Sequence, residues 1–192
     1  MKNIKFVTGL VRLSYANVWE AQAPMNNPNG PKKFSAALLI SKSDTKTMDR
    51  LKAAIKTLLN DAEVQDILKK RLKEEDLPIR DGDEKEEDTT GAYKGHWYVN
   101  AKANEDRPPV ILDRSGNEIM DRGEVYSGCY CQAVIGLYPY NKGGNRGIGV
   151  GLNGLKKIKD GDHLGGGSVS SSDFSDDLID DKDLDGVDDI FG

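Results

Sequence analysis

The segment EVYSGCYCQAVIGLYPY, residues 124–140, decides the fold because its side chains alternate between two chemical characters. Most odd-numbered positions from Val125 to Leu137 carry small or aliphatic groups, and most of the tyrosines fall on even-numbered positions. Successive side chains of a strand point to opposite faces, so the pattern predicts one long strand with an apolar face and a polar, aromatic face. A strand this long must bend or bulge, and Gly128 and Gly136 stand where it can.

Four other segments of the chain also alternate and predict further strands. HWYVNAKAN (96–104) has most of its apolar residues at odd positions, whereas the glycine-rich segment RGIGVGLNG (146–154) has its aliphatic residues at even positions. KKFSAALLIS (32–41) is a third, and residues 1–20 read as one long strand or as two joined near Gly9. Several alternating strands with glycines at the corners favour a mainly β fold, a closed or partly closed β-barrel.

An α-helical segment at about 44–75 is predicted to be inserted into this barrel. Apolar residues recur there at steps of three and four, starting at Met48, and Ser43 or Asp44 is a suitable N-cap. Pro78 is expected to end the helical segment. Residues 23–33 are rich in Pro and Asn and predict a loop, and residues 79–95 predict a mobile, hydrophilic, acidic loop.

The charges divide the chain into regions of opposite sign. The formal net charge is −5, but residues 165–192 alone carry −8 and residues 74–88 carry −7, which leaves +10 on the remainder. Residues 165–192 begin as a Gly/Ser linker and end as an acidic run with few apolar residues, so we expect a disordered tail after a domain at 1–164. A basic body with acidic appendages fits a polyanionic partner whose surface the appendages can screen.

The outward faces of the predicted strands carry five tyrosines. Exposed aromatic rings need a cover, and nucleobases stack on such rings without regard to sequence while Lys and Arg neutralise the phosphates. The alternation therefore predicts a single-stranded nucleic acid site formed by Tyr98, Tyr126, Tyr130, Tyr138 and Tyr140 with the cations Lys32, Lys33, Lys94, Lys102, Arg107, Lys142 and Arg146. Gly147, Gly149 and Gly151 would let a DNA backbone approach closely. Alternatively, the tyrosines cap the barrel ends, or pack under the helix or a dimer partner.

The sequence does not predict a metal site or a cofactor site. Residues 181–186 resemble the first half of an EF-hand loop, but the twelfth position is Gly192 instead of Glu. The carboxylates at 81–88 look like a fragment of a nuclease metal site, although a solvated loop is the simpler explanation. Cys129 and Cys131 are too close in sequence for a relaxed disulfide, and we expect buried thiols.

Several stretches resemble the single-stranded-DNA-binding proteins of tailed phages and prophages, which form an OB-fold family. They are LPIRDGD, HWYVNAKANEDRPPVILD, the opening stretch, and GNRGIGVGLNGLKKIKDGDHLGGG, of which the block 124–167 is the most specific. The terminal DDIFG is similar in kind to the acidic tails of bacterial and phage single-strand binders. The resemblance implies an OB-fold, binding with little sequence preference, no catalysis and no required metal.

Together these observations predict a non-enzymatic protein without a cofactor that coats and protects single-stranded DNA in phage replication and recombination. Its tail would modulate binding and recruit phage or host replication and recombination proteins through Asp188, Asp189, Ile190 and Phe191. A homodimer is a further expected association. No stretch is apolar enough for a membrane helix, so the host cytoplasm is the expected location. A metal-dependent nuclease and an annealing or scaffold protein are the alternatives.

Overall fold

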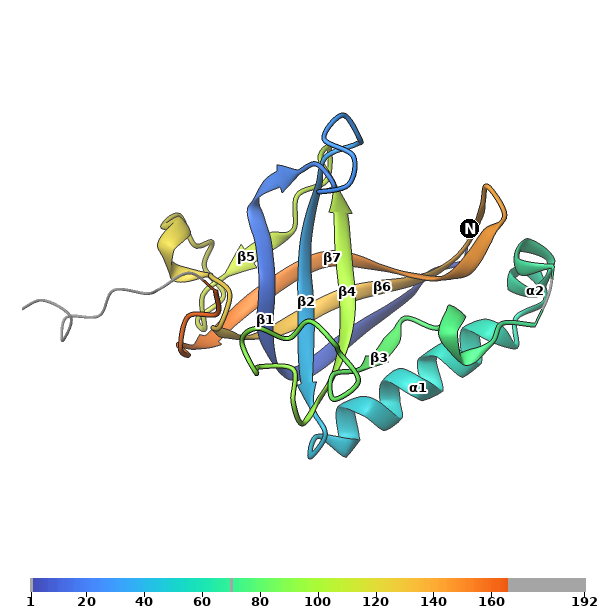
Figure 1. The fold of residues 1–192 in the computed structure, drawn as a ribbon, viewed down its shortest axis with the longest axis horizontal. Helices are drawn as coiled ribbons and strands as arrows, with labels where there is room; N and C mark the ends of the chain where they lie inside the picture. Colours follow the sequence, from blue (N-terminus) through green and yellow to red (C-terminus); the bar gives the residue numbers. More distant parts are fainter. Residues whose placement is uncertain (1, 70, 166–192) are drawn as a thin grey trace, which may run out of the picture.

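The computed structural model describes residues 2–69 and 71–165 (Figure 1). This part of the chain contains seven strands, two α-helices and two 3-10 turns. The strands are β1 (Ile4–Gln22), β2 (Lys33–Ser41), β3 (Ile79–Asp81), β4 (His96–Asn104), β5 (Val110–Leu112), β6 (Tyr130–Lys142) and β7 (Asn145–Lys159). The helices are α1 (Thr45–Leu59) and α2 (Ala62–Leu68), and the 3-10 turns are η1 (Glu74–Asp76) and η2 (Arg122–Glu124).

The strands form one sheet that closes on itself. Their order is β3-β4-β2-β1-β6-β7-β5, and an additional parallel pairing joins Lys102 of β4 to Gly151 of β7. Strands β1, β2, β4, β7 and β6 therefore form a five-stranded barrel, while β3 and β5 are short strands added beside β4 and β7. This closure confirms the predicted mainly β barrel and gives the five-stranded arrangement of an OB-fold.

The barrel interior follows the alternation of the opening stretch. In β6, Ala133, Ile135 and Leu137 are fully buried, and the residues between them are more exposed, except for Gly136. Cys129 and Cys131 are also fully buried and free, with their sulfur atoms 3.8 Å apart, which confirms the expectation of buried thiols. The predicted long strand exists, but it begins at Tyr130 because the chain turns at Gly128, whose φ is +118°.

Strand β1 departs from strict alternation between Thr8 and Val11, where its register with β6 shifts, and again at a second point farther along. Val11 and Leu13 point inward before this point, whereas Val18 points inward after it, so the inward positions change from odd to even numbers. Between them the register with β2 shifts, and Tyr15 adopts a left-handed backbone conformation with φ of +47°. One extra residue in a strand is a β-bulge, which reverses the face that each later side chain occupies.

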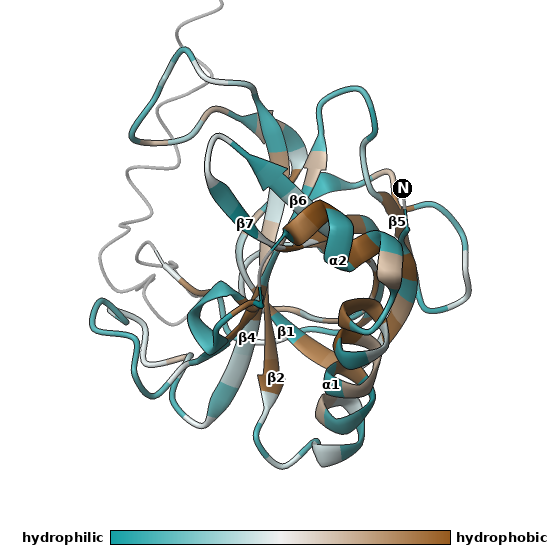
Figure 2. Cartoon of the chain, turned by 90° about the vertical axis from the view of Figure 1, so that its right-hand side faces the viewer, coloured by the Kyte–Doolittle hydropathy of each residue, from teal (hydrophilic) through white to brown (hydrophobic). Residues whose placement is uncertain are grey.

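The two helices lie together at one end of the barrel (Figures 1 and 2). The side chain of Asp44 caps α1 by accepting a hydrogen bond from the Thr47 amide at 3.0 Å, as expected for one of the two predicted N-caps. The apolar stripe of α1 and the two buried residues of α2 join the barrel core; the set is Met48, Leu51, Ile55, Leu58, Val64 and Leu68. The helices are therefore part of the same hydrophobic core as the strands.

We predict that Leu51→Ala lowers the free energy of unfolding by about 2–5 kcal/mol, because Leu51 is fully buried between helix and barrel. Urea denaturation monitored by circular dichroism measures the change. Lys46→Ala, on the exposed side of the same helix, is the control and should change the stability by less than about 0.5 kcal/mol. Equal effects of the two substitutions would contradict the packing described for α1.

Candidate nucleic-acid interface

The outer side of β1, β2 and β4 forms a broad polar surface. It is composed of Tyr15, Asn17, Ser35, Tyr98, Asn100 and Lys102, which we call the β1–β2–β4 face. Asn17 lies opposite Ser35 in the sheet, and Ser35 lies opposite Lys102, so the three side chains form one row across the strands. A hollow of about 390 Å³ opens beside this row and is also lined by Lys33 and by Met25 of the 23–32 loop.

Tyr15 is the most exposed tyrosine of the described chain, at 61%, and it was not among the predicted site residues. Strict alternation from Val11 and Leu13 would place it inside the barrel, and only the bulge turns it outward. A non-glycine residue with positive φ is uncommon, and such strain is concentrated at functional sites. The sequence contains no local signal for this bulge, which explains why the residue was missed.

A folded loop covers one end of the β1–β2–β4 face. The Tyr98 ring meets the Tyr93 ring edge-to-face, with centroids 5.0 Å apart, and both pack with Ala37, Leu39 and Ala92 in a small second core. Asp88 stabilises the turn by accepting hydrogen bonds from the amides of Thr90 and Tyr93. Tyr98 therefore lies on the predicted outer side, but it is half-buried and has only part of its ring available to a ligand.

The carboxylates at the start of this loop are paired with a lysine. The Lys42 ammonium lies 2.6 Å from an oxygen of Asp81 and 2.6 Å from an oxygen of Asp83, and Asp83 also accepts a hydrogen bond from the Gly95 amide. The hydrogen bond from Lys42 lowers the pKa of both carboxyl groups. Asp81 belongs to β3, so the expectation that no strand surrounds these carboxylates was wrong. In residues 2–69 and 71–165, no group of three or more His, Cys, Asp or Glu side chains could hold a metal ion.

Tyr138 and Tyr140 lie elsewhere, on the β6–β7 hairpin. Their rings lie against the glycines of β7: a Cβ atom at Gly149 would be 2.4 Å from the Tyr138 ring, and one at Gly147 would be 2.9 Å from the Tyr140 hydroxyl. These two glycines thus make room for tyrosine rings of the protein itself, not for an approaching DNA backbone as the sequence had suggested. The outer side of both rings and the exposed Lys142 remain accessible.

Arg146, on the same hairpin, makes a structural contact. Its Nη1 donates a hydrogen bond to the Leu68 carbonyl at the end of α2 at 3.3 Å, and Asn141 donates one to the Ile67 carbonyl at 2.8 Å. The hairpin is thereby fixed to the end of α2. Arg146 was predicted to contact phosphates, but its half-buried guanidinium is used to fix this helix, so we leave it out of the interface proposed below.

Tyr126 also makes structural contacts. Its ring stacks on His163 with centroids 3.9 Å apart, and its hydroxyl lies 3.0 Å from both the Asp160 carboxylate and the Gly161 carbonyl. Burial raises the pKa of this hydroxyl. Tyr126 attaches residues 160–163 to the barrel, and we leave it out of the interface as well.

Tyr130 lies at the start of β6, on a third part of the surface. The Arg12 guanidinium and the Lys159 ammonium lie 5.6 Å and 4.7 Å from the centroid of its ring. An aromatic ring beside two cations can bind a nucleotide, but Tyr130 and Tyr138 lie eight residues apart along one strand, about 27 Å. The five predicted tyrosines therefore do not form one continuous surface.

The predicted cations are distributed around the β1–β2–β4 face. Lys102 lies on it, and Lys33 lines the adjacent hollow. Lys32 is exposed and lines a neighbouring hollow together with Lys33 and Asn104. Arg107 follows the end of β4, and Lys94 precedes its start at the opposite end. The tail residues Asp188, Asp189, Ile190 and Phe191 lie outside the described residues.

Residues 4–185 match the family model described as the ssDNA-binding protein of Enterobacter phage Enc34. The chain belongs to this family. It is also 32% identical over 174 residues to putative protein p50 of Acyrthosiphon pisum secondary endosymbiont phage 1, a match that covers 88% of this chain and 90% of that protein.

Solved structures of two phage proteins have the same fold. The single-stranded DNA-binding protein of bacteriophage Enc34, solved in complex with ssDNA, superposes with a TM-score of 0.70 at 22% identity and covers 85% of this chain and 89% of its own. The single-stranded DNA-binding protein gp2.5 of bacteriophage T7 superposes with a TM-score of 0.62 at 14% identity, covering 86% and 97%. In the described parts of the chain, no helix is long and apolar enough to cross a membrane.

We predict that Lys42→Met lowers the midpoint of urea unfolding at pH 7 and that the difference from the unmodified chain narrows as the pH falls below the ordinary pKa of aspartate, about 3.9. Asp81 and Asp83 have lowered pKa values in the folded chain, so their contribution is present above their ordinary pKa and disappears as they become protonated. Glu84→Gln, at an exposed neighbouring residue, is the control and should have little effect on the unfolding midpoint at neutral or at acidic pH. A difference for Lys42→Met that stays the same at both pH values would show that the two ion pairs do not stabilise the loop.

Proposed function

We propose that this protein binds single-stranded DNA without catalysis and with little sequence preference, and that its main contact surface is the β1–β2–β4 face. The observation that supports this most directly is the combination of the exposed Tyr15 with the row Asn17, Ser35 and Lys102 beside an open hollow. OB-folds bind single strands on such a surface, where aromatic rings stack on bases and cations line the backbone path. The family membership and the ssDNA complex of the Enc34 protein support the same proposal.

Two further surfaces extend the proposed path of the DNA. Tyr138 and Tyr140 with Lys142 form one, and Tyr130 with Arg12 and Lys159 forms the other. The protein would thereby coat and protect single strands during replication and recombination of a phage genome in the host cytoplasm. The paired state of Asp81 and Asp83 with Lys42 supports DNA binding over metal-dependent cleavage.

The binding proposal predicts that affinity for a fluorescent dT oligonucleotide falls steeply as the salt concentration rises, because phosphate neutralisation releases counterions. Tyr15→Ala should weaken binding by about 1–3 kcal/mol, the usual value of one stacked base. Met120→Ala, at an exposed residue away from the three surfaces, is the control and should leave affinity unchanged. Fluorescence anisotropy across a salt series measures both effects.

The same titrations compare how much each surface contributes to DNA affinity. Tyr138→Ala removes one ring of the hairpin surface, and Tyr130→Ala removes the ring of the surface with Arg12 and Lys159. Affinity that is independent of salt, or that Tyr15→Ala leaves unchanged, would contradict the proposed face. Incubating the labelled oligonucleotide with the protein and magnesium or manganese tests the nuclease alternative, and we expect the strand to remain intact.

We further propose that the acidic tail lowers DNA affinity and recruits replication or recombination proteins. Deleting residues 168–192 removes all of the −8 charge of this region, so binding to the dT oligonucleotide should tighten, most clearly at low salt. Anisotropy titrations of the full and truncated chains measure the change. Unchanged affinity at low salt would show that the tail does not compete with DNA.

A further inference from the structure

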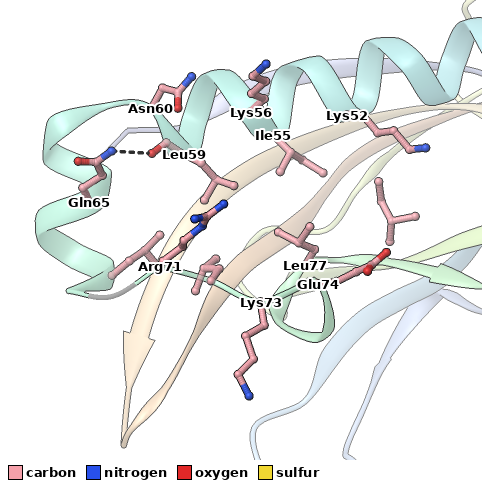
Figure 3. A pocket seen from close by; sticks show the side chains of 13 residues that line it. Lys52, Ile55, Lys56, Leu59, Asn60, Gln65, Arg71, Lys73, Glu74 and Leu77 are labelled. Atoms are coloured by element: carbon pink, nitrogen blue, oxygen red, sulfur yellow. Dashed lines mark hydrogen bonds between the residues drawn. The ribbon is translucent and has the colours of Figure 1, made fainter.

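A large groove lies between the helices and the segment that follows them. It has a volume of about 840 Å³ and is bounded by α1, α2 and residues 71–79 (Figure 3). Its surface is mainly apolar and includes Ile55, Leu59, Leu68, Leu72, Leu77 and Ile79. Sites for organic ligands have volumes of about 300–1,000 Å³ and similar apolar linings, so this groove can hold a few large side chains.

The charged groups around the groove are mostly cations. Lys52, Lys56, Arg71 and Lys73 line it, with Glu74 as its acidic lining residue. Figure 3 shows Arg71 pointing into the space toward Leu59, whereas Lys56 and Lys73 point away from it on either side. Lys73 pairs with Glu75, but in residues 2–69 and 71–165 no carboxylate is in ion-pair contact with Lys52, Lys56 or Arg71. An occupant that matches this groove has apolar side chains next to negative charges.

The chain contains two segments with this chemistry, DDLI at 176–179 and DDIF at 188–191, and the second has the larger, aromatic side chain. The last residues of the chain are Asp188, Asp189, Ile190, Phe191 and Gly192, two carboxylates followed by two large apolar side chains. We propose that Ile190 and Phe191 dock into the groove of the same molecule, with Asp188 and Asp189 near Lys52 and Arg71. This proposal concerns a surface separate from the hollow on the β1–β2–β4 face, since the two share no lining residue. It does not depend on DNA binding.

The segment is long enough to reach the groove. The described chain ends beside Ser127, because the Leu164 amide donates a hydrogen bond to the Ser127 carbonyl. From this region β6 runs to the end of α2, a distance of about 40 Å. Residues 166–191 are long enough to span roughly 85 Å when fully extended, about twice this distance. A tether of this kind gives an effective concentration on the order of mM, so even a weak contact would be populated.

Docking would control access to the apolar end of the tail. When the end of the tail is held in the groove, Phe191 is covered. A partner protein must then displace the tail from the groove to reach this side chain. Docking also keeps the two terminal carboxylates at the helical end of the barrel. The groove thus would serve as an intramolecular storage site for the segment proposed to recruit partners.

Photo-crosslinking in the full chain tests this inference. Phe191→p-benzoylphenylalanine keeps an aromatic side chain at the tip, and the protein is irradiated without DNA at low micromolar concentration and mapped by mass spectrometry. We expect crosslinks within residues 52–79 in a product that remains monomeric. The charge-reversal variant K52E/R71E should lower the yield about three- to tenfold, the size expected for two exposed ion pairs.

The controls separate charge at this site from net charge. K46E/R114E makes the same two types of substitution at exposed positions outside the groove and should leave the yield unchanged. K52R/R71K keeps both positive charges and should retain the crosslinking yield. This result would show that a lower yield in K52E/R71E is caused by the change of charge. Crosslinks to the β1–β2–β4 face, crosslinked dimers, no crosslinks, or a yield unaffected by K52E/R71E would each overturn the proposal, whatever the affinity for DNA.

Discussion

The parallel contact between β4 and β7 is the constraint on which the rest of the structure depends. It joins the sheet at one register pair, Lys102 with Gly151, and turns five strands into a closed barrel. Closure gives every barrel strand an inner and an outer side, so small and aliphatic residues fill the interior and polar residues face outward. Strands β4 and β7 pair only at Lys102 and Gly151. Next to this pair, η1 packs against β7, and the Asp76 carbonyl lies close to Gly147.

Closure also determines where the candidate interface lies. Strand β1 must pair with β6 in its first half and with β2 in its second half, so it has to bend. One of the irregularities in β1 is the bulge at Tyr15, where a left-handed residue costs about 1–3 kcal/mol of local strain. The pairing on both sides of the bulge stabilises it. The most exposed ring of the candidate interface is therefore a direct result of how the barrel closes.

Local periodicity predicted the elements that have one buried side. The β6 alternation, the strand at 96–104 and the stripe of α1 all appear in the structure, because burial on one side leaves a regular pattern in the sequence. Contacts between distant segments leave no such pattern. Tyr15 was missed because a bulge reverses the side of the strand that it occupies. Arg146 lies on a predicted strand but donates a hydrogen bond to the end of α2, and Gly149 makes room for the Tyr138 ring.

The acidic segment 74–88 contains both paired and exposed carboxylates, and their positions indicate a direction for the DNA. Asp81, Asp83 and Asp88 bond to Lys42 or to backbone amides, so these carboxylates stabilise the loop over Tyr98. The exposed Glu84, Glu86 and Glu87 of the same loop repel phosphates at that end of the β1–β2–β4 face. Lys32, Lys33, Lys102 and Arg107 lie toward the other end, where the acidic neighbours Glu105 and Asp106 leave an excess of positive charge. A single strand on this face would therefore cross β1, β2 and β4 near Tyr15 and Lys102 instead of running along β4 to Tyr98.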